Sequence, residues 1–456
     1  MSEFDYSKQT VIVVGAGKSG IAAVDALSGR AKEIILFEGD ETKKEEDIRA
    51  KLSPSFDGRI VIGSLSDSDM DKCTLLVLSP GVPTDKDFVV KLKEKGVTIW
   101  GEAELGYRMS KGRLAAITGT NGKTTTTSLL GEIAKSQFES VFVVGNIGTP
   151  CTEVALSTTD DSVQVAEMSS FQLESIDEFH PQVSMILNIT PDHLNRHHTM
   201  EAYADAKANI MRNQTPDETC ILNYEDERVR NMAALSKAKV VFFSSERELE
   251  NGIFLRGKQI IYRDGGVETY IMDTDEMNII GKHNHENAMA AIAGAIALGV
   301  SLENIRKSVR EFVAVEHRIE YTCTKNGVKY YNDSKGTNPD ASVQAVKAMP
   351  SPTILIGGGY DKKIPFDDYV KAFEGKIKYL LLMGQTAGDI AKCCDKYGFK
   401  DYVFVNSMKE AIDFAYAHAE PGENVLLSPA CASWGMYDNY EVRGREFKDL
   451  ARNLPD

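Results

Sequence analysis

The stretch Ile117-Thr118-Gly119-Thr120-Asn121-Gly122-Lys123-Thr124-Thr125-Thr126 decides how the rest of the chain is interpreted. The apolar run 114–117 predicts a buried strand, and residues 128–134 have the apolar spacing of a helix. A strand, a glycine-containing loop and a helix N-terminus favour phosphate, because free backbone N–H groups and the helix dipole both attract anions. Lys123 is expected to reach the β- and γ-phosphates, and the Thr124 hydroxyl to hold Mg²⁺. The stretch therefore predicts a nucleotide site, with a simple glycine turn before a helix as the alternative.

Length and composition indicate a multidomain cytoplasmic enzyme. A chain of 456 residues predicts two or three domains. No apolar run approaches the roughly 20 residues that cross a bilayer, and the N-terminus lacks the basic and apolar regions of a secretion signal. The seven cysteines lack C-x-x-C spacing and suit a reducing compartment. The net charge of −15 argues against a nucleic-acid surface, so we expect neither nucleic acid nor membrane as a partner.

The N-terminal part resembles a dinucleotide-binding pattern. The apolar strand 10–14 leads into Gly15-Ala16-Gly17-Lys18-Ser19-Gly20, and Glu38 follows a second strand where a ribose-binding acid is expected. The glycines indicate that a phosphate or a sugar can approach the backbone, but they do not identify the ligand. These elements predict a small doubly wound domain of about 100 residues.

Two strands of the central part end in side chains suited to a metal. The run 163–166 leads into Glu167, and the run 183–189 leads to Asp192 and His193. Ligands of α/β sheets bind at the carboxyl ends of the strands, so Glu167 is a candidate Mg²⁺ ligand there. A lone histidine is usually structural, but the position of His193 beside an Asp favours a metal-site role.

Other polar residues of the central part carry weaker signals. His197 and His198 are interpreted as loop residues, and the composition around Lys207 predicts an ordinary exposed helix lysine. Asn284 and Asn287 stand at the start of a small-residue helix, where they could cap the helix or face a nucleotide base.

The C-terminal part continues the alternation of apolar strands and polar, glycine-bearing loops. Examples are the stretches 328–338, 353–363 and 425–434. This alternation predicts a parallel sheet. The expected fold is therefore α/β with three domains: a Rossmann-like domain at 1–103, a central P-loop ATPase-type domain with a mostly parallel sheet at 104–314, and a Rossmann-like domain at 315–456.

Several motifs in this order resemble the Mur ligase family over essentially the whole chain. They are Gly-Thr-Asn-Gly-Lys-Thr at 119–124, Glu-Met-Ser-Ser-Phe-Gln-Leu-Glu at 167–174, Asp-His-Leu-Asn-Arg-His at 192–197, Gly-Lys-His-Asn at 281–284, His-Arg-Ile-Glu at 317–320, Asn-Asp-Ser-Lys-Gly-Thr-Asn at 332–338 and Ser-Pro-Ala-Cys-Ala-Ser-Trp at 428–434. The second and the last are more specific to the members that add D-glutamate. Asn195 stands where the family has an Asp.

The resemblance implies an ATP-dependent amide ligase that adds D-glutamate to UDP-N-acetylmuramoyl-L-alanine through an acyl phosphate. Such an enzyme acts in cytoplasmic peptidoglycan precursor synthesis, and so in cell-wall formation, cell shape and cell division. A monomer is expected. In phosphoryl transfer the protein mainly positions groups and neutralises charge, which suits these residues.

The resemblance also implies a role for each candidate residue. Lys123, Glu167, His193 and Lys207 are the catalytic candidates. Two Mg²⁺ ions are expected on Thr124, Glu167, His193 and Lys207, with Lys207 carbamylated and thereby an oxygen ligand. The ATP site is expected to consist of Gly119, Thr120, Asn121, Gly122, Lys123, Thr124, Thr125, Asn284, Arg318 and Asp333. The UDP-sugar substrate is expected at Lys18, Ser19, Glu38, Gly39, Ser79, Asn146 and Ser169, and D-glutamate at Lys335, Thr337, Lys362, Ser433 and Tyr440.

Three other functions are weighed against this one. An NAD-dependent oxidoreductase would explain the first glycine loop but not the central Gly-Lys-Thr loop. A P-loop kinase or switch would not need Lys335, Lys362 and Ser433 in a third domain. A folylpolyglutamate synthase-like ligase is opposed by the two motifs specific to D-glutamate addition.

Overall fold

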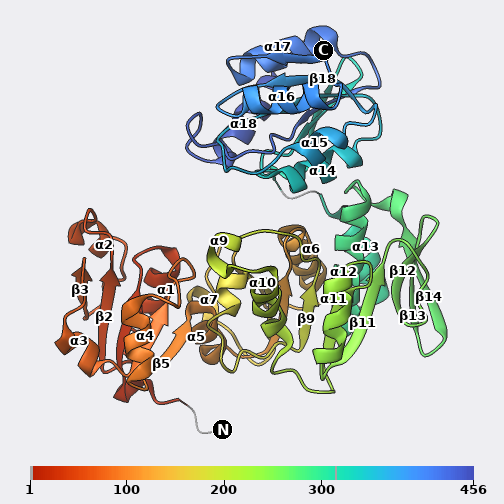
Figure 1. The fold of residues 1–456 in the computed structure, drawn as a ribbon. Coiled ribbons are helices and arrows are strands. Elements are labelled where there is room, and N and C mark those ends of the chain that lie inside the picture. Colours follow the sequence, from red (N-terminus) through yellow and green to blue (C-terminus); the bar gives the residue numbers. More distant parts are fainter. Residues whose placement is uncertain (1–3, 314–315) are drawn as a thin grey trace. The chain divides into compact units, whose positions relative to one another are not determined.

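The computed structural model describes residues 4–313 and 316–456, which form three sheets covered by helices (Figure 1). The described residues fall into two compact units. One holds those up to Thr274 together with Glu286–Val309, and the other holds Asp275–His285 and those from Arg310 onward. The expected boundary at 314–315 lies outside the described residues, and the boundary at 103–104 stays a prediction. Among the described helices, none is both long and apolar enough to cross a bilayer.

The N-terminal sheet is entirely parallel, in the order β3-β2-β1-β4-β5. Odd-numbered residues of β1, such as Val11 and Val13, pack in one core with α1, whereas Ile12 and Val14 pack on the opposite face with α3 and α4. Strand β1 is covered on both faces, which explains why its sequence is almost entirely apolar. Its elements are β1 (Thr10–Val14), α1 (Lys18–Leu27), β2 (Glu33–Glu38), α2 (Glu45–Arg49), β3 (Arg59–Ile62), α3 (Asp67–Lys72), β4 (Leu75–Leu78), α4 (Asp87–Glu94), β5 (Thr98–Gly101) and α5 (Glu102–Met109).

The central sheet has the order β14-β13-β12-β11-β10-β9-β6-β8-β7. It is parallel from β7 to β12 and ends in the antiparallel strands β13 and β14, which the sequence interpretation did not foresee. The strands are β6 (Arg113–Thr118), β7 (Val141–Gly145), β8 (Val163–Glu167), β9 (Val183–Ile186), β10 (Thr219–Asn223), β11 (Lys239–Ser244), β12 (Gly252–Arg256), β13 (Gln259–Asp264) and β14 (Val267–Asp273). The helices are α6 (Lys123–Lys135), α7 (Cys151–Ala155), α8 (Ser170–Leu173), α9 (Leu194–His197), α10 (Met200–Ala208), α11 (Glu227–Asn231), α12 (Lys282–Ala297) and α13 (Leu302–Glu311).

The C-terminal sheet has the order β15-β16-β20-β17-β18-β19 and is parallel except for the pair β15–β16. Helices α14, α15 and α16 cover one face, and α17 and α18 cover the other. The predicted Rossmann-like arrangement is therefore found, with an antiparallel edge. The elements are β15 (Glu320–Lys325), β16 (Val328–Asn332), α14 (Pro339–Ala348), β17 (Thr353–Gly357), α15 (Asp367–Lys371), β18 (Ile377–Leu382), α16 (Ala387–Lys396), β19 (Tyr402–Phe404), α17 (Met408–His418), β20 (Asn424–Leu427) and α18 (Tyr440–Arg452).

Candidate active site

The Gly-Lys-Thr stretch is a strand, a loop and a helix N-terminus, as the sequence predicts. Strand β6 leads into the loop, and Gly122 is the N-cap of α6 with a left-handed φ of +86°. A Cβ atom at Gly122 would lie 2.2 Å from Oδ1 of Asn287, so only glycine fits this close approach. The Lys123 ammonium donates to the carbonyl oxygens of Gly119 and Thr120, both at 2.9 Å. The loop therefore has the strand–loop–helix geometry expected of a phosphate site, with Lys123 folded back onto the loop carbonyls.

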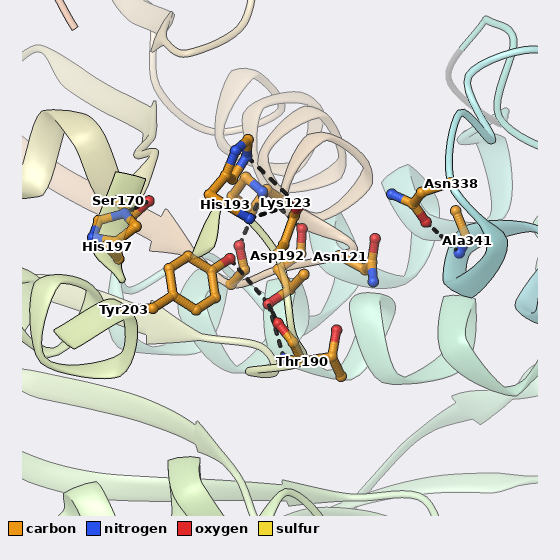
Figure 2. A network of polar contacts seen from close by, with 12 residues as sticks. Asn121, Lys123, Ser170, Thr190, Asp192, His193, His197, Tyr203, Asn338 and Ala341 are labelled. Carbon is orange, nitrogen blue, oxygen red and sulfur yellow. Dashed lines mark hydrogen bonds and ion pairs between the residues drawn. The ribbon is translucent and has the colours of Figure 1, made fainter. Parts of the chain in front are cut away.

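Hydrogen bonds join this loop to the segment that carries His193 (Figure 2). The Thr120 hydroxyl lies 3.1 Å from both the Thr190 carbonyl oxygen and the Tyr203 hydroxyl. The backbone N–H of Asn121 donates to the side-chain Oδ1 of Asn188 at 2.8 Å. The two candidate segments, distant in sequence, thus meet at one edge of the central sheet.

Lys207 is not the exposed lysine that its sequence context predicts. Its exposed fraction is 1%, and its Nζ atom donates to the carbonyl oxygen of Gly119 at 2.8 Å. Burial, together with the positive charge of Lys123, holds the pKa of the Lys207 ammonium well below its ordinary value. The sequence context failed here because a short helical stretch does not show that one of its lysines is turned into the interior of the fold.

Glu167 offers the oxygen atom that a cation requires. It ends β8 and is 1% exposed. Its Oε1 atom accepts from Nδ2 of Asn146 at 2.8 Å, whereas Oε2 is buried without a hydrogen-bond partner among the described residues. A buried carboxylate oxygen without a donor is costly, and Mg²⁺ would satisfy it. Glu167 therefore fits the Mg²⁺ that the predicted ATP site implies.

His193 stands at the N-cap of α9 with a left-handed φ of +53°. Its Nε2 atom lies 3.6 Å from an Asp192 carboxylate oxygen, and its ring meets the Phe171 ring edge-on at 4.9 Å. The side chain is about half exposed. The expected Asp–His pair is thus present near the nucleotide loop.

His197 is a correction to the loop assignment, because it ends α9 and is only 6% exposed. It contacts the Ser170 hydroxyl at 2.9 Å and the Glu174 carboxylate at 3.1 Å. The same carboxylate pairs with Arg196 at 2.6 Å, and Arg196 also donates to the Val82 carbonyl oxygen at 3.2 Å. The sequence alone assigned no role to Glu174, Arg196 or His197. Their ion pairs join residues from two separate motifs, and a linear motif does not show such contacts.

The residues expected to bind the UDP-sugar lie at the carboxyl ends of strands in the first unit. Glu38 accepts the backbone N–H groups of Ala16 and Asp40, both at 3.0 Å, and so braces the glycine loop. Lys18 donates to the Gly148 carbonyl oxygen. Ser169 caps α8 through a reciprocal pairing with Gln172, so its hydroxyl has a structural use. The remaining residues expected to bind the UDP-sugar, which lie in the same unit, are Ser19, Gly39, Ser79 and Asn146.

Three residues expected for ATP lie in the second unit. Asp333 is fully buried and accepts from the Ser428 hydroxyl at 2.7 Å. Burial raises its pKa to about 6, against the opposing charge of Arg318. Asn284 is 2% exposed and donates to the Ile280 carbonyl oxygen at 2.8 Å. Thus Asn284, Arg318 and Asp333 belong to one unit, and the glycine loop belongs to the other.

The residues expected for D-glutamate cluster around loops of the C-terminal sheet. The Lys335 ammonium lies 5.7 Å from the Tyr440 ring, and that of Lys362 lies 5.7 Å from the Trp434 ring. Ser433 is 3% exposed, and Thr337 is half-buried.

Arg443 organises these loops and was missed from the sequence. It is 2% exposed and donates to the carbonyl oxygens of Ser334 at 2.8 Å and Cys431 at 3.2 Å. Burial lowers its pKa to about 10. An arginine three residues into a polar helix gives no sign that it points inward.

Comparison with protein families finds three matching models along the chain. Residues 9–101 match the Mur ligase MurD-like N-terminal domain, 117–295 the Mur ligase middle domain, and 317–431 the Mur ligase glutamate ligase domain. Curated relatives named UDP-N-acetylmuramoylalanine–D-glutamate ligase include those of Lachnoclostridium phytofermentans (57% identical, covering 98% of each chain) and Clostridioides difficile (44% identical, covering 99% of this chain and 100% of the relative).

Solved structures share the fold at low identity. UDP-N-acetylmuramate-alanine ligase MurC from Thermotoga maritima is 19% identical with a TM-score of 0.60, covering 97% of this chain and 99% of that one. MurF from Acinetobacter baumannii is 17% identical with a TM-score of 0.62, covering 97% and 93%. These likenesses concern the three-sheet α/β architecture.

Proposed function

We infer that this chain, which belongs to the Mur ligase family, is an ATP-dependent ligase that adds D-glutamate to UDP-N-acetylmuramoyl-L-alanine in peptidoglycan precursor synthesis. The observation that carries this inference is the convergence of Lys123 and Lys207 on the carbonyl oxygen of Gly119, because it brings an ammonium group and a buried amine with a lowered pKa together at the loop where a terminal phosphate would lie. A relative that is 57% identical carries the name of a D-glutamate ligase, so neither an oxidoreductase nor a folate-specific ligase is favoured.

The reaction divides into two steps. The substrate carboxylate attacks the γ-phosphorus of ATP, which forms an acyl phosphate and releases ADP. The amine of D-glutamate then attacks the acyl carbon and loses a proton, the amide bond forms, and phosphate leaves. Lys123 would neutralise charge on the γ-phosphoryl group during transfer, and the loop N–H groups would hold the other phosphates.

We propose that Thr124, Glu167, His193 and Lys207 hold two Mg²⁺ ions, which supply charge neutralisation at the phosphates. The unpartnered Oε2 of Glu167 supports this proposal. Lys207 would act as a carbamate, formed when its neutral amine adds CO₂ and releases a proton. Its lowered pKa supports this step, because only the neutral amine is nucleophilic. We propose further that the enzyme is a cytoplasmic monomer that serves cell-wall formation, cell shape and cell division.

Substrate contacts are proposed as well. Asn284, Arg318 and Asp333 would contact adenine, phosphate and ribose. Lys335, Thr337, Lys362, Ser433 and Tyr440 would bind D-glutamate, whose two carboxylates suit lysines and hydroxyls. The UDP-sugar would lie on the first glycine loop with Lys18, Ser19, Glu38, Gly39, Ser79, Asn146 and Ser169.

The test is phosphate release from ATP with Mg²⁺ and UDP-N-acetylmuramoyl-L-alanine, with D-glutamate, L-glutamate or no amino acid added. Release that requires D-glutamate is expected. Release independent of any amino acid would contradict ligation and leave only a nucleotide hydrolase or switch.

A further inference from the structure

The turn at His317–Arg318–Ile319 has a backbone that side chains disfavour. His317 and Ile319 have φ values of +66° and +47°. Residues with side chains adopt this left-handed region only where surrounding contacts hold them. His317 is 2% exposed and Ile319 is 4% exposed, whereas Arg318 between them is half-buried. The two buried neighbours therefore fix where the Arg318 side chain starts.

Glu320 and Asn332 hold the turn from the side of the sheet. The Oε2 atom of Glu320 accepts the backbone N–H of His317 at 2.9 Å and Nδ2 of Asn332 at 3.1 Å. The same Asn332 nitrogen lies 2.8 Å from Nδ1 of His317. The carbonyl oxygen of His317 accepts the backbone N–H of Lys335 at 3.0 Å. Hydrogen bonds thus fix both the backbone and the imidazole ring of His317.

Helix α18 supports the turn from behind. Its Lys448, 7% exposed, pairs with Oε1 of Glu320 at 2.9 Å and with Glu316 at 2.6 Å. One turn earlier on the same helix, a Cβ atom on Gly444 would lie 2.2 Å from Nδ1 of His317. Normal contact is about 3.5 Å, so a methyl group there would displace the ring by about 1 Å.

The side chains of Glu316, His317 and Glu320 offer atoms within 4.8 Å of one another, a spacing that could hold a cation. The Lys448 ammonium already pairs with both carboxylates, so it supplies the positive charge that they need. The cluster is therefore better explained as a support for the turn than as a metal site.

We propose that Lys448 and Gly444 are positioning residues, which hold the His317–Ile319 turn so that Arg318 meets a phosphate of ATP. This inference rests on the proposed function, in which Arg318 contacts that phosphate. Neither residue needs to touch substrate. Gly444 leaves room for the imidazole, and Lys448 keeps the Glu320 carboxylate aligned with the His317 N–H.

The first test compares Gly444→Ala with Gly388→Ala. Gly388 lies in helix α16 of the same unit, and a Cβ atom there would meet nothing within 4 Å. Gly444→Ala is expected to raise the KM for ATP roughly 10- to 100-fold and that for D-glutamate less, because a shift of about 1 Å misplaces the arginine. Gly388→Ala should match the unaltered enzyme. Equal ATP KM values in the two variants would overturn the proposal.

The second test compares Lys448→Met with Lys378→Met. Lys378 bridges two glutamates in the same unit, at 3.0 Å from Glu423 and 3.2 Å from Glu420. Lys448→Met is expected to weaken binding of a non-hydrolysable ATP analogue, measured by titration calorimetry, at least about fivefold, and Lys448→Arg to restore most of it. Equal binding of the analogue by both methionine variants would contradict a positioning role for Lys448.

These outcomes separate the inference from the function on which it rests. If the unaltered enzyme releases no phosphate in response to D-glutamate, the proposed function fails. If it does so and the Gly444 and Lys448 variants behave as their controls, only the positioning role fails. Thermal melting of each variant identifies loss of folding, which would lower both substrate affinities together.

Discussion

At the scale of single residues, Lys207 is the side chain whose replacement is expected to affect the proposed reaction most. It is buried, and burial lowers its pKa. We expect Lys207→Ala to lower kcat at least roughly 100-fold, because it removes a proposed metal ligand. Added acetate or formate should partly restore activity by supplying a carboxylate in the vacated space. Steady-state phosphate release measures both effects, with the exposed helix lysine Lys135 replaced by alanine as a control. Full activity of Lys207→Ala would remove this residue from the mechanism.

Lys335 and Ser433 are expected to serve the amino acid rather than the nucleotide. Lys335→Ala and Ser433→Ala should each raise the KM for D-glutamate more than tenfold, about 1.4 kcal/mol or more, because a carboxylate loses a charged or hydroxyl partner. The KM for ATP should change less. The exposed Lys363 is a control lysine in the same unit. A defect confined to ATP would move these residues to the nucleotide site.

Asp333 gives a pH-dependent contribution to stability. Its pKa is raised from 3.8 to about 6 in the folded protein, so the folded state binds more protons than the unfolded state between these values. Its contribution to folding therefore falls as pH rises from about 4 to 6, by about 3 kcal/mol, and stays low above pH 6. Asp333→Asn does not titrate, so its Tm relative to the unaltered protein should rise across this window. A constant Tm difference from pH 4 to 7 would contradict this assignment.

At the scale of elements, the loop between β6 and α6 depends on the neighbouring start of α12. Gly122→Ala puts an alanine at a position with a left-handed φ of +86°. Its methyl group would also collide with the side chain of Asn287. We expect ATP affinity to fall at least roughly tenfold, because the loop N–H groups turn away from the phosphates. Gly299→Ala is the control, since Gly299 also has a left-handed φ (+82°) but nothing within 4 Å of its would-be Cβ atom. Equal nucleotide affinities, measured by calorimetry, would show that the close approach is unimportant.

Elements with uniform apolar character were predictable, whereas those set by distant pairing were not. Each predicted strand that leads into a polar loop is present, because a strand covered on both faces must be apolar throughout. The antiparallel strands β13 and β14 were missed because they mix exposed polar residues with short buried pairs, which carries a weak strand signal. The short helix α9 was missed because its four residues are organised by Glu174 and Ser170, which lie elsewhere in the chain.

At the scale of the whole molecule, the described residues form two compact units with separate hydrophobic cores. We expect calorimetric unfolding to show more than one transition, because each unit can lose its core independently. Asp333→Asn should shift the transition of the second unit and leave the other unchanged. A single transition whose calorimetric and van't Hoff enthalpies agree would show that the units unfold together.

The sequence by itself determined the α/β class, the strand–loop–helix of the predicted nucleotide site and the family, since these depend on local apolar patterning and on contiguous motifs. Tertiary structure decided which polar side chains are buried together. Lys207, His197 and Arg443 resemble surface residues in sequence, yet each is enclosed by segments far away in the chain. The physical reason is that the environment of a charge is set by all the elements packed around it, and no short stretch of sequence contains them.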